Sequence, residues 1–162
     1  MAMEIRFPIT ILVMALVLFA APPLSAGFTP AKVGARDKCP VCGMFVAKYP
    51  DFVAQVRFGD GSTFHFDGAK DMFKFCLDPS RYLPGRKKAA IVAAFVTSYY
   101  DLVLVDALSA WYVVGSDVYG PMGRELIPFA REAEAQEFLK DHKGKRIVRF
   151  REVTPAVLRP LD

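Results

Sequence analysis

The sequence predicts an α+β protein in which two small, similar subdomains follow a cleaved signal peptide. Three observations support this fold class. The chain begins with an apolar segment, the order strand, strand, helix occurs twice after it, and a stretch containing Pro84 and Gly85 separates the two halves. The chain has 162 residues, of which 53% are hydrophobic, enough for one ordinary domain or two very small ones with a real core.

Residues 1–26 have the three parts of a signal peptide. Arg6 precedes an apolar run over residues 7–21, and a stretch of small residues follows the run. Because the run is shorter than the roughly 20 apolar residues that span a bilayer, we expect cleavage after Ala26 and export. Membrane association is expected only if the signal remains uncleaved.

The first subdomain is predicted over residues 39–90, after an extended lead-in over residues 27–38. Its expected elements are strands over residues 44–48, 52–58 and 62–66 and a helix over residues 68–77. Gly59-Asp60-Gly61 predicts a hairpin turn between the second and third strands. Asp67 is the expected N-cap of the helix, and Asp78-Pro79 ends it.

The second subdomain is predicted over residues 91–162. Its expected elements are, in order, strands over residues 91–100, 102–105 and 111–114, a turn-rich loop over 115–123, a strand over 126–129, a helix over 130–142 and a strand over 147–153. Aromatic and β-branched residues indicate the strands. The helix is expected to turn Ala133, Phe138 and Leu139 inward and Glu132, Glu134 and Glu137 outward, and Gly144 ends it.

Charge and motifs argue against two classes of function. The formal net charge of +4 is mild and dispersed, and the chain lacks a run of Lys and Arg with interleaved aromatics, so nucleic acid is not an expected partner. Two histidines do not provide a credible serine, histidine and acid arrangement, and no phosphate-binding glycine-rich loop precedes a helix. The sequence therefore does not predict an enzyme.

The segment with clear chemistry is Cys39-Pro-Val-Cys42, followed by Gly43. This spacing allows both sulfurs to face one centre from a tight turn, and thiolates suit Cu(I) and Zn(II). In an oxidising compartment the same pair also fits a redox site or a local disulfide. The pair precedes a predicted strand instead of opening a helix, so the helix dipole that lowers a thiol pKa is not expected, which disfavours redox catalysis.

The other possible ligands favour copper over zinc. Met44 adds a thioether two residues after Cys42, and a neutral thioether is a better ligand for monovalent copper than for zinc. A structural zinc site needs four ligands, and the chain has no second Cys-x-x-Cys pair. The spare candidates fit other roles better, because Cys76 has the position of a buried free thiol and His65 that of an exposed strand residue.

A second methionine has an unusual setting in the segment Tyr119-Gly-Pro-Met122-Gly. A core methionine normally follows helical or strand periodicity, as Met72 does. Met122 is instead flanked by residues that shape the backbone, so we expect its sulfur to be exposed and available as a ligand.

Together these motifs make the chain resemble the NosL family of copper-binding accessory proteins of nitrous oxide reductase. The resemblance covers about residues 39–153 and is carried by Cys39-Pro-Val-Cys42-Gly-Met44, Phe66-Asp67-Gly68, Asp71-Met72-Phe73, Trp111-Tyr-Val-Val-Gly-Ser116 and Gly120-Pro-Met122-Gly123.

The resemblance implies two small α+β subdomains, binding of one Cu(I), and supply of copper to a client cuproenzyme such as nitrous oxide reductase in the periplasm. By matching motifs, it implies Cys39, Cys42, Met44 and Met122 as metal-binding residues. One feature departs from the family, since many members are lipoproteins with a cysteine at the mature N-terminus. No cysteine lies near Ala26-Gly27, so the sequence does not predict a lipid anchor.

Overall fold

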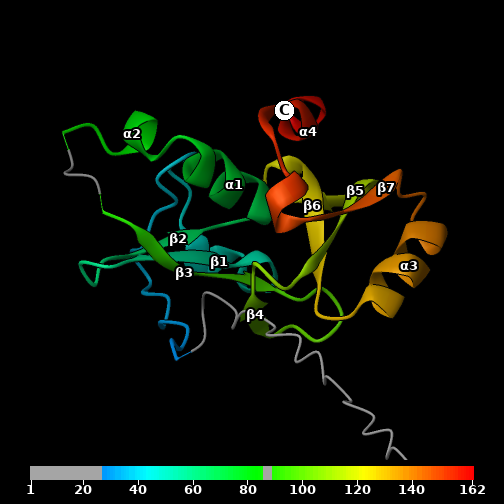
Figure 1. Ribbon diagram of the computed structural model, residues 1–162, viewed down its shortest axis with the longest axis horizontal. Coiled ribbons are helices and arrows are strands. Elements are labelled where there is room, and N and C mark those ends of the chain that lie inside the picture. Colours follow the sequence, from blue (N-terminus) through cyan, green and yellow to red (C-terminus); the bar gives the residue numbers. More distant parts are fainter. Residues whose placement is uncertain (1–26, 86–88) are drawn as a thin grey trace, which may run out of the picture.

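The computed structural model describes residues 27–85 and 89–162, and the predicted signal peptide over residues 1–26 lies outside them. Two antiparallel sheets form the molecule (Figure 1). The first, in the order β2-β1-β3-β4, contains β1 (Ala54–Phe58), β2 (Thr63–Phe66), β3 (Ile91–Thr97) and β4 (Leu104–Asp106). The second, in the order β6-β5-β7, contains β5 (Trp111–Gly120), β6 (Gly123–Phe129) and β7 (Arg146–Arg149).

Short helices complete the fold. They are α1 (Ala69–Leu77), α2 (Pro79–Tyr82), α3 (Glu132–Asp141) and α4 (Pro155–Leu158), with 3₁₀ turns η1 (Val46–Lys48), η2 (Pro50–Phe52), η3 (Phe150–Glu152) and η4 (Arg159–Leu161). Within the described residues, none of the helices is both long and apolar enough to cross a membrane.

The two sheets repeat one topology, which confirms the predicted α+β class. In the first unit the chain order is β1, β2, α1, β3, and in the second it is β5, β6, α3, β7. In both, the first strand is central and pairs antiparallel with the second and the last. Because β3 and β4 pair within the first sheet, the change of sheet falls after residue 106, not at residue 90. The division into two subdomains stays a prediction.

Aromatic side chains hold each helix to its sheet and the two sheets to each other. On the first sheet, the ring of Phe66 lies 5.1 Å from that of Phe75 on α1. On the second, Phe129 lies 4.9 Å from Phe138 on α3. Phe73 of α1 lies 5.1 Å from Tyr112 of β5, edge to face. Helix α1 therefore belongs to the core of both units.

Three sequence predictions of local structure were wrong. Residues 44–48 are not a strand, because Phe45 alone forms a β-bridge, with Lys38. The chain then enters two consecutive 3₁₀ turns, in the first of which the Tyr49 N–H donates to the Val46 carbonyl. The expected loop over residues 115–123 is instead a long hairpin, since a positive φ at Gly115 and a register shift allow β5 to continue to Gly120.

The third concerns the C-terminal strand, expected over residues 147–153. It ends at Arg149, because the Glu152 carboxylate accepts a hydrogen bond from the Arg149 backbone N–H and the chain turns into η3.

A buried hydroxyl connects the end of the first sheet to the second. Tyr112 is fully buried and its hydroxyl donates to the carbonyl of Ala107 over 2.6 Å. We expect Tyr112→Phe to lower the free energy of unfolding by about 1–3 kcal/mol, since it leaves a buried acceptor unpaired. Tyr100→Phe, at a side chain that is 44% exposed, should change it by less than about 0.5 kcal/mol. Urea denaturation measures both, and equal effects would contradict the role of this hydrogen bond.

Candidate metal centre

The Cys39–Met44 segment is a closed loop. The N–H of Cys39 donates to the Met44 carbonyl over 2.9 Å, and the N–H of Gly43 donates to the Cys39 carbonyl over 2.8 Å. Gly43 has φ +81°, a conformation that a side chain would strain. Lys38 and Phe45 pair at the base of the loop. These contacts hold both cysteines on one side of a rigid turn.

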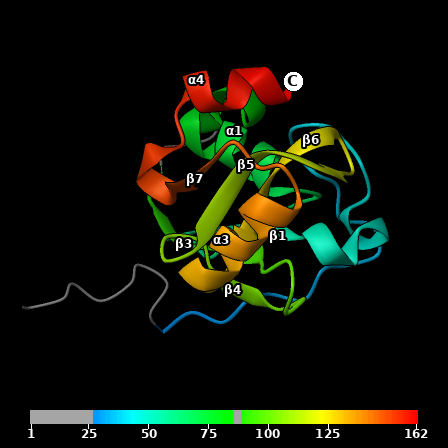
Figure 2. The same ribbon diagram turned by 90° about the vertical axis from the view of Figure 1, so that its right-hand side faces the viewer.

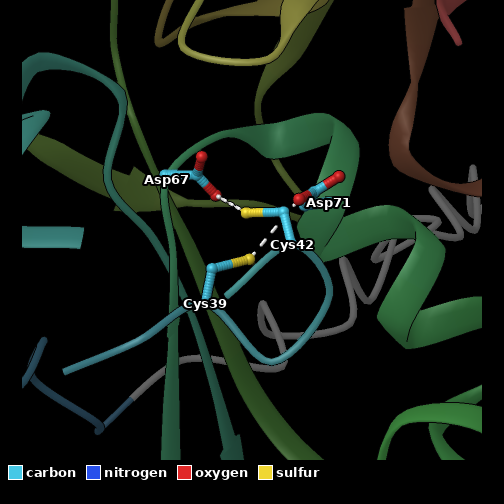
Figure 3. A group of neighbouring side chains, drawn as sticks. All are labelled: Cys39, Cys42, Asp67 and Asp71. Atoms are coloured by element: carbon cyan, nitrogen blue, oxygen red, sulfur yellow. Dashed lines mark hydrogen bonds between the residues drawn. The ribbon is translucent and has the colours of Figure 1, made fainter. Parts of the chain in front are cut away.

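The loop places its two sulfurs against two carboxylates from the start of α1. One ligand atom from each of Cys39, Cys42, Asp67 and Asp71 lies within 4.8 Å of all the others. The Cys39 thiol lies 3.4 Å from Asp71 Oδ2, and the Cys42 thiol lies 3.2 Å from Asp67 Oδ1, as Figure 3 shows. Cys42 is half-buried and the other three residues are buried. This group has the size and the donor set of a metal site.

The surroundings keep both thiols protonated until a cation arrives. Burial raises the pKa of Cys42 to about 12, and the neighbouring Asp67 carboxylate adds to the rise. Burial also raises the pKa of Cys39 strongly, an effect that the backbone amides of Cys42 and Val41 oppose and the carboxylates of Asp67 and Asp71 reinforce. The same negative charges that disfavour a free thiolate attract a positive ion.

One oxygen of the site lacks a partner. Asp67 Oδ2 is buried and has no hydrogen-bond partner among the described residues. A buried carboxylate oxygen without a partner is costly in a folded protein. A cation bound in this cluster would compensate for that cost.

The two predicted methionine ligands lie in different settings. Met44 is half-buried and closes the loop through its carbonyl. Met122 is 45% exposed, in the turn between β5 and β6, as the sequence led us to expect. That turn is connected to α1, because Lys70 Nζ donates to the Met122 carbonyl over 2.9 Å. The structure thus unites the two cysteines, and the binding roles of the two methionines stay predictions.

Comparison with known proteins identifies the family of this chain. The model of the NosL family matches residues 30–158 of the chain, a range that includes both sheets, the loop and the turn with Met122. The chain belongs to the NosL family.

Two relatives are informative. The copper-binding lipoprotein NosL of Stutzerimonas stutzeri is 34% identical over 126 residues, which is 75% of this chain and 64% of that protein, so the match leaves about a third of the relative uncovered. The crystal structure of the copper chaperone NosL from Shewanella denitrificans matches with a TM-score of 0.67 and 26% identity, covering 83% of this chain and 99% of that one.

In this member of the NosL family a buried lysine and a buried glutamate connect the metal site to the hairpin. Lys70 donates through Nζ to the carbonyls of Met122 and Leu161, each over 2.9 Å. Glu125 accepts from the backbone N–H groups of Lys70, over 2.6 Å, and Leu126, over 2.9 Å. Burial raises the pKa of Glu125 to about 8. The start of α1, the hairpin and the C-terminal turn are thus joined at one point.

Sequence reasoning missed the two aspartates as site residues. It treated Asp67 as the helix N-cap, but the N-cap is Gly68, and the Asp67 carboxylate instead faces the Cys42 thiol. The available signal was that Asp67 and Asp71 lie on either side of the predicted helix start, only four residues apart.

His65 was also predicted wrongly, as an exposed strand residue. It is 9% exposed, and its Nδ1 lies 3.0 Å from Asp37 Oδ2. The lead-in covers this face of the sheet, where the Gln55 side chain exchanges two hydrogen bonds with the backbone of Ala31.

Cys76 is a half-buried free thiol packed against the main core.

The link between α1 and the hairpin can be tested by substitution. Lys70→Met keeps the bulk of the side chain but leaves two carbonyls without their charged donor, so we expect the free energy of unfolding to fall by about 2–4 kcal/mol. Lys74→Met on the same helix removes an ion pair with the exposed Asp162 and a longer one, over 3.9 Å, with Asp71, and should cost about 1 kcal/mol or less because Lys74 itself is only half-buried. Similar losses in the two variants, measured by urea denaturation, would contradict the role assigned to Lys70.

The raised thiol pKa values predict slow chemical modification. Since only the thiolate attacks iodoacetamide, Cys42, whose pKa is about 12, should react slowly at pH 8 and about tenfold faster for each pH unit up to pH 10. Asp67→Asn removes a charge that raises this pKa and should accelerate the reaction, whereas Asp51→Asn, at an exposed position, should not. Mass spectrometry of the reduced protein follows both rates. Rapid modification at pH 7 would contradict the proposed surroundings of the thiol.

Proposed function

We propose that this protein is an exported Cu(I)-binding metallochaperone in which Cys39 and Cys42 are the principal ligands. The observation that supports this most directly is the placement of two thiols on one closed loop, within 4.8 Å of two buried carboxylates. Membership of the NosL family adds support, since relatives are named as a copper-binding lipoprotein and a copper chaperone.

The donor set suits monovalent copper as cargo. Thiolates and thioethers are soft ligands, and Cu(I) is a soft ion. Met44 belongs to the same loop as the cysteines. Met122 lies on a turn whose carbonyl accepts a hydrogen bond from Lys70, the residue before Asp71. In our proposal the two cysteines provide most of the affinity, and one or both methionines assist binding and release.

Release requires that an incoming ligand can reach the ion. Cys42 is half-buried, whereas Cys39 is only 1% exposed. An acceptor can therefore approach the Cys42 side of the site and replace its ligands one at a time, which a closed four-ligand cage would slow. We propose that the acceptor is a periplasmic cuproenzyme such as nitrous oxide reductase, with the predicted signal peptide providing export.

A thiol-disulfide redox role for the same pair has less support. Redox cysteines of this spacing depend on a lowered thiol pKa, commonly at the start of a helix. Here burial and carboxylates raise both pKa values, and the pair lies in a loop that is followed by the 3₁₀ turn η1.

An anaerobic Cu(I) titration of the reduced protein against a chromogenic chelator tests the proposal. We expect about one Cu(I) per chain to bind in competition with a micromolar-affinity chelator. Cys39→Ser/Cys42→Ser should reduce affinity by at least about 100-fold, because both soft thiolates are lost. Cys76→Ser, which changes the third cysteine, should leave affinity unchanged, and Met122→Leu and Met44→Leu should show smaller losses.

Two results would contradict the proposal. Retained affinity in the double cysteine variant would exclude the loop as the copper site. Reduction of insulin by the unaltered protein, without Cu(I) binding, would instead support the redox role.

A further inference from the structure

The segment that carries the metal loop is unusually basic. Within residues 32–48 there are four basic side chains, all exposed, and they are Lys32, Arg36, Lys38 and Lys48. The one acidic residue of this segment is Asp37, whose Oδ2 accepts a hydrogen bond from the Gly34 N–H over 2.8 Å and lies 3.0 Å from His65 Nδ1. None of the four cations forms an ion pair with any residue in the described ranges. Their positive charge is therefore directed at solvent.

An exposed aromatic ring lies beside two of these charges. Phe45 directly follows the metal loop and is 38% exposed. The ammonium groups of Lys38 and Lys48 lie 5.0 Å and 5.8 Å from the centre of its ring. Lys38 precedes Cys39 and pairs with Phe45 at the base of the loop. The ring and its two cations are thus fixed beside the cysteines by the same backbone contacts that close the loop.

We propose that these five residues, Lys32, Arg36, Lys38, Phe45 and Lys48, form a docking surface for an acidic face of the protein that exchanges copper with this site. We name them the basic collar. The inference rests on the proposed function, and it adds the chemical character of the partner. An acidic surface would pair with the four cations, and an apolar side chain at its centre would cover Phe45.

The position of the collar favours a protein partner over a membrane. Transfer by ligand exchange brings the acceptor's ligands to bonding distance of a copper ion held by the half-buried Cys42. The acceptor then contacts the residues at the base of the loop. Complementary charge would orient the approach and speed it, with a strong dependence on salt. An anionic bilayer bound to the same collar would instead cover Cys42.

Figure 2 shows where this surface lies relative to the rest of the molecule. The lead-in, in blue, passes along the lower side of the molecule, the η1–η2 segment, in cyan, lies at the right, and α3 lies in front at the centre. Lys140 on α3 and Arg151 in η3 are exposed cations outside the collar. They provide a control for changes in net charge alone.

The test uses hexaglutamate as an acidic probe and amide NMR shifts of the reduced, ¹⁵N-labelled protein. We expect shift changes to concentrate in residues 32–48 and to fall at least about fivefold in 0.5 M NaCl, since salt screens exposed charges. Lys38→Glu/Lys48→Glu should weaken peptide binding at least about tenfold. Lys140→Glu/Arg151→Glu, which changes the net charge equally, should retain most of it.

Several outcomes would overturn the collar as a protein-docking surface. Shift changes centred elsewhere would do so, as would equal weakening in the two double variants. Sedimentation of the protein with phosphatidylglycerol vesicles in a collar-dependent way, without binding of the peptide, would assign the surface to membranes. Cu(I) affinity is measured in parallel, so that an effect of the substitutions on the metal loop is separated from their effect on docking. Absence of copper binding would refute the proposed function. The peptide titration would still show whether the collar binds an acidic partner.

Discussion

The pairing of buried polar groups at the start of α1 is the constraint on which the rest of this structure depends. Asp67, Lys70 and Asp71 are each 3% exposed or less, and a buried charge without partners destabilises a fold by several kcal/mol. The metal loop, the β5–β6 hairpin and the C-terminal turn supply those partners through the Cys42 thiol and the carbonyls of Met122 and Leu161. Helix α1 therefore fixes three segments that are distant in sequence.

Close packing makes this junction intolerant of change. A Cβ atom added at Gly68 would lie 2.2 Å from Glu125 Oε2, and one added at Gly120 would lie 3.1 Å from the Cγ of the same residue. Both glycines are needed for the carboxyl group of Glu125 to reach the α1 backbone. The hairpin that carries Met122 is consequently positioned by Glu125 and by the Met122 carbonyl, while the Met122 side chain stays exposed.

The sequence predicted the features that depend on local pattern. The Cys39 and Cys42 pair, the exposure of Met122 and the repeated order of strands and helices all follow from spacing or periodicity over a few residues. The partners of the cysteines could not be found in this way, because Asp67 is 25 residues from Cys42 and Asp71 is 32 residues from Cys39. Only the packing of α1 against the loop brings them together.

Glycine and proline were the main sources of error. Gly115 and Gly120 indicated a loop, yet the positive φ of Gly115 and a register shift allow β5 to pass through Gly115 and continue to Gly120. Residues 44–48 have the composition of a strand, but the site needs the chain to turn immediately after the loop, and Pro50 begins a second 3₁₀ turn. In both places tertiary requirements override local preference.

X-ray absorption at the copper edge of the Cu(I)-loaded protein tests the central claim most directly, because it reports the ligand atoms themselves. The account predicts a first shell dominated by sulfur, which is lost in Cys39→Ser/Cys42→Ser and kept in Cys76→Ser. A shell of nitrogen and oxygen atoms, or a sulfur shell unchanged in the double variant, would show that copper binds elsewhere and would contradict the assignment of this loop as the copper site.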